Sequence, residues 1–171
     1  MTHNTASFSA RLTAAIQSKG TPACIGLDPK ASALPPALLQ NISAPENAPP
    51  HQLAEIYLQF CKGVIDVVAP LVPIVKPQLA YFEALGPDGT TALAEVIAYA
   101  HEKELLVLAD GKRGDIGSTA EAYAAGWLAG LAHLAHGVEV LWLEALFVVE
   151  GDEALVARLQ VEEALLTARA L

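Results

Sequence analysis

The stretch that decides the fold is Leu108-Ala109-Asp110-Gly111-Lys112-Arg113-Gly114-Asp115-Ile116-Gly117-Ser118-Thr119. It begins within the apolar run Leu105–Ala109, which is typical of a buried β-strand. In an extended segment Asp110 and Lys112 point to the same side, and Asp115 follows on a glycine-rich turn. The pattern predicts an acid–base–acid cluster at the tip of a strand, with a helix beginning at the Ser-Thr pair.

Two earlier apolar runs have the same form. Ala23–Leu27 is followed by Asp28, and Leu71–Val75 is followed by Lys76. Because ligands of parallel α/β folds bind where the strands end, we expect Asp28, Lys76 and Asp110 to converge on one rim. Opposite charges placed in alternation keep each lysine protonated and each carboxylate ionised.

Apolar side chains at helical spacing predict helices between these strands. The expected helices cover about residues 8–19, 51–68, 90–103 and 118–128, with a helical turn over 78–85. Residues 29–50 are rich in proline and are expected to form a long loop, and Gly86-Pro87-Asp88-Gly89 is expected to form a turn. Strands that alternate with helices predict an α/β fold with a parallel sheet.

The composition excludes several classes of protein. The chain has 171 residues, of which 53% are hydrophobic, and a formal net charge of −9. That length usually corresponds to one domain, and the apolar content excludes a disordered chain. The sequence has no apolar run long enough to span a membrane and no apolar signal core at its start, so we expect a cytoplasmic protein that binds no membrane. An acidic chain without a basic stripe is a poor binder of nucleic acid.

The two cysteines, Cys24 and Cys61, fit neither a zinc motif nor a disulfide scaffold. We therefore predict that both are buried free thiols. No metal site is expected.

The segment Leu105–Thr119 resembles the signature of the orotidine 5′-phosphate decarboxylase family. The resemblance extends to Cys24–Pro29 and Val75–Glu83, covers roughly residues 8–128, and together with the proline-rich insert indicates the longer bacterial branch. It implies a TIM (β/α)8 barrel that forms a homodimer. It also implies decarboxylation of orotidine 5′-monophosphate to UMP, in pyrimidine biosynthesis, without a cofactor or metal.

The same resemblance implies a role for each matching residue. Lys112 resembles the proton donor to C6 of the pyrimidine, and Asp110 resembles the carboxylate beside the substrate carboxylate. Lys76 and Asp28 match residues that hold the ribose hydroxyls and join the charge network. The residues implied at a site shared with the partner subunit are Asp115, Ile116 and Thr119.

The family pattern is not evident after about residue 130. A complete barrel needs eight βα units and about 250 residues. We expect one α/β domain over 1–171, with a barrel-like half at 8–128 and a divergent tail at 131–171 that holds 7 acids and 2 bases. The chain is then a truncated or frame-shifted product, a half-barrel that pairs with another chain, or a divergent enzyme.

Two other functions stay open. Mg²⁺-dependent sugar-phosphate decarboxylases and hexulose-phosphate synthases share Asp-x-Lys-x-x-Asp but carry an acidic ligand on the second strand, where Lys76 would repel a metal. The other function is that of a non-catalytic remnant or interaction module. It is suggested by a tail that lacks the glycine/arginine phosphate grip the family places near its end.

Overall fold

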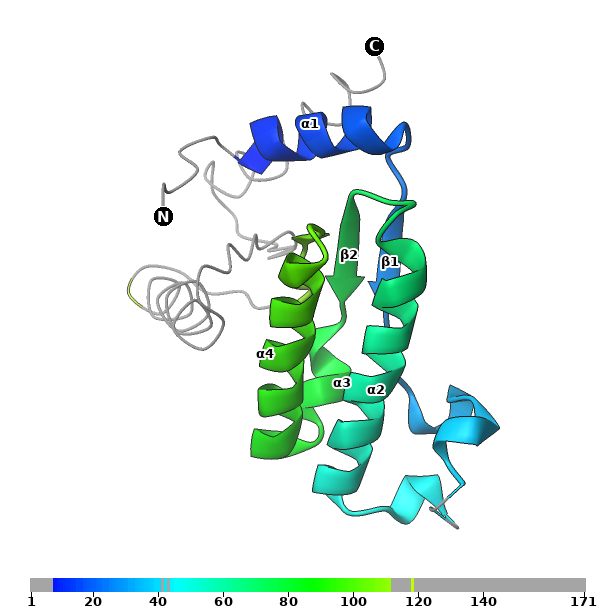
Figure 1. Ribbon diagram of the computed structural model, residues 1–171. Coiled ribbons are helices and arrows are strands. Elements are labelled where there is room, and N and C mark those ends of the chain that lie inside the picture. The colour runs from blue at the N-terminus through cyan, green and yellow to red at the C-terminus, as the bar shows by residue number, and fades with distance from the viewer. Residues whose placement is uncertain (1–7, 41, 43, 112–117, 119–171) are drawn as a thin grey trace.

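The architecture comes from a computed structural model that describes residues 8–40, 42, 44–111 and 118 (Figure 1). The expectations for the helix at 118–128 and for the tail at 131–171 therefore lie outside the described residues, apart from Ser118, which is helical. Four expected site residues lie outside them as well: Lys112, Asp115, Ile116 and Thr119.

Helices and strands alternate along the described chain, as expected. Three parallel strands form a sheet in the order β1-β2-β3. The elements are α1 (Phe8–Lys19), β1 (Cys24–Leu27), the 3₁₀ turns η1 (Ala31–Ala33), η2 (Pro36–Leu38) and η3 (Pro45–Asn47), α2 (Pro50–Val68), β2 (Ile74–Pro77), α3 (Leu79–Glu83), α4 (Gly86–Glu102) and β3 (Leu106–Val107). The fold is thus α/β with parallel strands.

The sheet has two different faces, because side chains alternate along each strand. On one face Leu27, Val75 and Val107 are buried in a large core with α2 and α4, which lie side by side over the sheet (Figure 1). On the other face the register places Gly26 beside Lys76 and Ile74 beside Leu106. This second face is the one that carries the charged residues described below.

Helix α1 lies across the amino-terminal ends of β1 and β2 (Figure 1). Its buried side chains Leu12 and Ile16 form a small apolar cluster with Ile74. The helix ends at Gly20, whose φ of +69° suits a residue without a side chain. Lys19 Nζ then donates a 2.8 Å hydrogen bond to the Ala69 carbonyl, which fixes this helix to the end of α2.

The second strand begins later than the sequence predicted. After α2 the chain makes a further turn, in which the Leu71 and Val72 amides both donate to the Val68 carbonyl. The apolar run expected as strand Leu71–Val75 is therefore partly used in the turn, and β2 covers Ile74–Pro77. Lys76 consequently lies within the strand rather than after it.

The segment expected as a turn at residues 86–89 is instead the first turn of α4. Pro87 is tolerated there because the first helical amides need no acceptor within the helix. Thr90 and Thr91, near which the helix was expected to begin, donate their hydroxyls to the Gly86 and Pro87 carbonyls within the helix. Gly89 is buried, and a side chain there would meet the backbone of Phe82 in α3.

The prediction of two buried thiols is half wrong. Cys61 is buried in the core beneath α2, whereas Cys24 is exposed at the start of β1. The register puts Cys24 beside Ile74, on the sheet face opposite the large core, so the helices that bury Cys61 do not reach it.

Candidate functional site

A partly buried ion pair joins β2 to the segment after β3. Lys76 Nζ lies 2.8 Å from Asp110 Oδ2, and the Asp110 residue is only 5% exposed. The Lys76 side chain is 33% exposed, so the pair is partly open to water. The sequence predicted that these two residues would meet at the carboxyl ends of neighbouring strands, and they do.

Gln78 joins the same carboxylate, and the sequence analysis did not single it out. Its Nε2 donates to Asp110 Oδ2 at 2.9 Å, so one carboxylate oxygen accepts from both Gln78 and Lys76. The signal was in the spacing, because residues two apart in an extended segment point to the same side. A neutral amide two positions after Lys76 was not recognised as part of a charged cluster.

The backbone fixes this arrangement. The Asp110 amide donates to the Pro77 carbonyl at 3.0 Å, and the Leu79 amide donates to the Asp110 carbonyl at 3.1 Å. On its other side Gln78 is held by its backbone amide, which donates to the Leu27 carbonyl at 3.1 Å. Asp110 is therefore bound to β2 through both its main chain and its side chain.

Asp28 lies directly after β1 at the same rim and is exposed. Gly26 leaves space for it, since a Cβ at that position would lie 3.3 Å from Asp28 Oδ2. Asp28 is close enough for its charge to raise the pKa of Lys76. The structure thus brings all three described candidates to one rim, with Lys76 paired to Asp110 and Asp28 acting on it through space.

The charges around Lys76 keep it protonated. Partial burial is the largest single effect and lowers its pKa, but the hydrogen bond and charge of Asp110, together with the charge of Asp28, outweigh it and raise the pKa above 10.5. At neutral pH the group is a fixed ammonium. A fixed cation in a partly buried site can orient hydroxyl groups and stabilise nearby negative charge.

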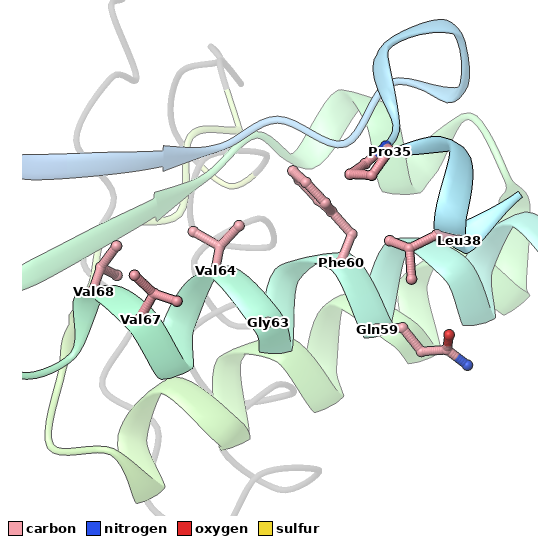
Figure 2. Close-up of a pocket in the computed structure, with 8 residues that line it drawn as sticks. All are labelled: Pro35, Leu38, Gln59, Phe60, Gly63, Val64, Val67 and Val68. Carbon is pink, nitrogen blue, oxygen red and sulfur yellow. The ribbon is translucent and has the colours of Figure 1, made fainter.

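A groove beside the described elements is chemically different from this rim. It is an open groove of about 410 Å³ along α2, lined by apolar side chains and one amide. Figure 2 shows Phe60 extending from α2 toward Pro35, with Val64, Val67 and Val68 further along the helix. This groove offers no charged group for a phosphate, so it does not serve as the candidate site.

The described part of the chain holds neither a three-residue metal cluster nor a membrane-spanning helix. Residues 8–40, 42, 44–111 and 118 contain no group of three His, Cys, Asp or Glu side chains placed to hold a metal ion. None of the helices described there is both long and apolar enough to cross a bilayer.

The fold and the site define a class. Parallel strands are joined by helices outside the sheet, and polar and charged side chains are gathered where the strands end, as in α/β barrels that bind small molecules at this rim. The sequence profile of the orotidine 5′-phosphate decarboxylase / HUMPS family matches residues 21–144. The chain therefore belongs to this family, and the match extends past residue 128, the limit expected from the motifs.

Known relatives agree with this assignment. The chain is 49% identical over 121 residues to orotidine 5′-phosphate decarboxylase of Rhodopirellula baltica, covering 71% of this chain and 39% of the relative. It is 44% identical over 126 residues to the enzyme of that name in Deinococcus radiodurans, covering 74% and 40%. The structure of Leishmania donovani OMP decarboxylase superposes with a TM-score of 0.56 at 30% identity, covering 74% of this chain and 41% of that one. The chain thus spans about two fifths of the length of these curated relatives and is homologous to a carboxy-lyase.

Proposed function

We propose that this protein acts in the decarboxylation of orotidine 5′-monophosphate to UMP, a step of pyrimidine biosynthesis. The observation that carries the proposal is the partly buried Lys76–Asp110 pair. The pair lies at the carboxyl ends of parallel strands, and Asp110 stands two residues before Lys112 in the sequence of a chain from this family. The pair supplies a fixed cation and a fixed anion where the resemblance expects the reacting part of the substrate.

The chemistry requires such a site. The bond between C6 of the pyrimidine and its carboxylate breaks, CO₂ leaves, and the electron pair that remains on C6 accepts a proton. This carbanion has no adjacent electron sink, so the site has to stabilise negative charge at C6 and deliver the proton there. We assign proton donation to Lys112 and the place beside the departing carboxylate to Asp110.

The charges involved are large enough to matter. Two unit charges 4 Å apart interact by about 4 kcal/mol at an effective dielectric constant of 20. Exchanging repulsion between the substrate carboxylate and Asp110 for attraction between C6 and Lys112 would therefore lower the barrier by several kcal/mol. The two donors on Oδ2, the Lys76 ammonium and the Gln78 amide, would stabilise the negative charge that Asp110 needs for this task.

The remaining assignments complete the proposal. Lys76 and Asp28 bind the ribose hydroxyls, and both lie at the rim. Asp115, Ile116 and Thr119 belong to a site shared across a homodimer. The protein works in the cytoplasm on a free nucleotide, and we propose neither a cofactor nor a metal for the reaction.

A titration with UMP tests the proposal. A ligand that binds the folded chain alone must raise its melting temperature, so UMP is expected to do so and uridine, which lacks the phosphate, to do so less. Release of CO₂ from orotidine 5′-monophosphate is then measured with and without Mg²⁺. Lys112→Ala is expected to remove turnover and to leave UMP binding measurable.

Three other outcomes would contradict parts of the proposed function. Turnover retained in Lys112→Ala would remove Lys112 as the proton donor. A requirement for Mg²⁺ would favour a sugar-phosphate decarboxylase or aldolase of the same family. Absence of both UMP binding and turnover would favour a non-catalytic chain.

A further inference from the structure

We propose that Gln78 is a positioning residue that fixes the orientation of the Asp110 carboxylate. This inference rests on the proposed function, in which Asp110 must face the substrate carboxylate. It concerns a residue of the Val75–Glu83 stretch to which the resemblance assigned no role. Its basis is the geometry at the end of β2.

The Asp110 carboxylate has two donors on one oxygen. Lys76 Nζ lies 2.8 Å and Gln78 Nε2 lies 2.9 Å from Oδ2. These two donors reach Oδ2 from different residues, so together they restrict rotation of the carboxylate about its Cβ–Cγ bond. Once Oδ2 is fixed, the position of Oδ1 follows from the planar geometry of the group.

Gln78 is itself well anchored. Its backbone amide donates to the Leu27 carbonyl in β1, and its backbone forms an isolated parallel β-bridge with Asp110. Its Oε1 accepts from the Ala80 amide at 3.4 Å, which caps α3. The side-chain amide is therefore oriented, with its oxygen toward the helix and its nitrogen toward Asp110.

The chemistry of an amide suits this place. Asp28, Lys76 and Asp110 are the described charged groups at the rim, with two negative charges and one positive. A second lysine at position 78 would compete with the substrate for Asp110, and an acid would repel Asp110. A neutral donor holds the carboxylate without changing the charge that the substrate meets.

The first experiment tests the contact between Gln78 and Asp110. Gln78→Glu keeps an acceptor for the Ala80 amide but loses the donor to Asp110. Loss of this donor and repulsion between the two acids predict a melting temperature lower by about 5 °C at pH 7, and a smaller difference at lower pH, where protonation of either acid removes the repulsion. A side chain at position 78 that did not reach Asp110 would leave the melting temperature unchanged.

A double variant supplies the matched control. Gln78→Glu with Asp110→Asn exchanges acid and amide, restoring one donor, one acceptor and the original charge beside Lys76. It is expected to recover most of the lost melting temperature. Unchanged stability in the single variant, or no recovery in the double variant, would overturn the proposal.

Turnover supplies an independent readout. Gln78→Leu is expected to lower kcat at least tenfold while KM changes less than threefold, because UMP and the substrate ribose do not depend on Asp110 orientation. A KM that rises as much as kcat falls would contradict positioning. If the wild-type chain shows neither UMP binding nor turnover, the proposed function fails, and the melting experiments still decide whether Gln78 fixes Asp110.

Discussion

Replacing Lys76 by Met should destabilise the protein much more than replacing an exposed lysine. The methionine keeps the apolar stem and removes the ammonium. The Asp110 carboxylate, at 5% exposure, then loses its ammonium donor and keeps the hydrogen bond from Gln78. Removing one partner of a fully buried ion pair costs about 3–5 kcal/mol. Lys76 is 33% exposed, so water replaces part of the lost contact, and we expect a loss of about 2 kcal/mol in the free energy of unfolding.

Urea unfolding followed by circular dichroism at pH 7 measures this loss. Lys62→Met is the matched control, because Lys62 Nζ lies 4.0 Å from Glu95 Oε2 and both side chains are more exposed, at 38% and 54%. Its cost is expected to stay below about 1 kcal/mol. Adding Asp110→Asn to Lys76→Met removes the negative charge at position 110 and should recover part of the lost free energy of unfolding.

Two results would refute this reasoning. One is a Lys76→Met variant that unfolds at the same urea concentration as Lys62→Met. The other is a double variant no more stable than Lys76→Met alone, because then the cost would not come from the charge of the Asp110 carboxylate.

Three further predictions concern glycine positions, thiols and alkaline pH. Gly89→Ala should lower the free energy of unfolding by about 1–3 kcal/mol, because the added Cβ meets the Phe82 backbone. At Gly63 an added Cβ meets open space, so Gly63→Ala should raise the free energy of unfolding by up to about 1 kcal/mol. Equal effects of the two variants in urea unfolding would contradict this. With a thiol reagent at pH 8, exposed Cys24 should react before Cys61, although partial burial raises the pKa of the Cys24 thiol and slows its reaction. Cys61 should react only on unfolding, since burial and then the charge of Asp28 raise the Cys61 pKa to about 12; two thiols that react at the same rate would be the opposing result. Because the pKa of Lys76 is raised in the folded protein, its contribution to stability is complete below pH 10.5 and is lost as the pH rises through the pKa of the folded state. The difference in stability between wild type and Lys76→Met should therefore narrow above pH 10.5. A difference that stayed constant would contradict this prediction.

The strand ends were predictable because their side chains are charged and follow apolar runs. Lys76 and Asp110 were expected at one rim from that pattern, and the structure pairs them. The parallel order of the strands also follows from the alternation of strands and helices. These features depend on local sequence and on a general rule of topology.

Other features depend on tertiary contacts that the pattern does not contain. The strand β2 starts later than predicted because the chain makes one more turn after α2. The helix α4 begins at Gly86, earlier than predicted, and packs closely against α3 at Gly89. Gln78 escaped notice because an amide has no charge to mark it. The roles of Lys112, Asp115, Ile116 and Thr119 stay predictions, since they lie outside the described residues.

The position of α1 has a consequence for the access of water to the sheet. Its side chains Leu12 and Ile16 pack against Ile74, with Leu106 and Leu108 partly buried beside them, so they keep water from this apolar part of the sheet. Deleting α1 would expose these apolar side chains, whereas the Lys76–Asp110 pair lies toward the carboxyl ends of the strands.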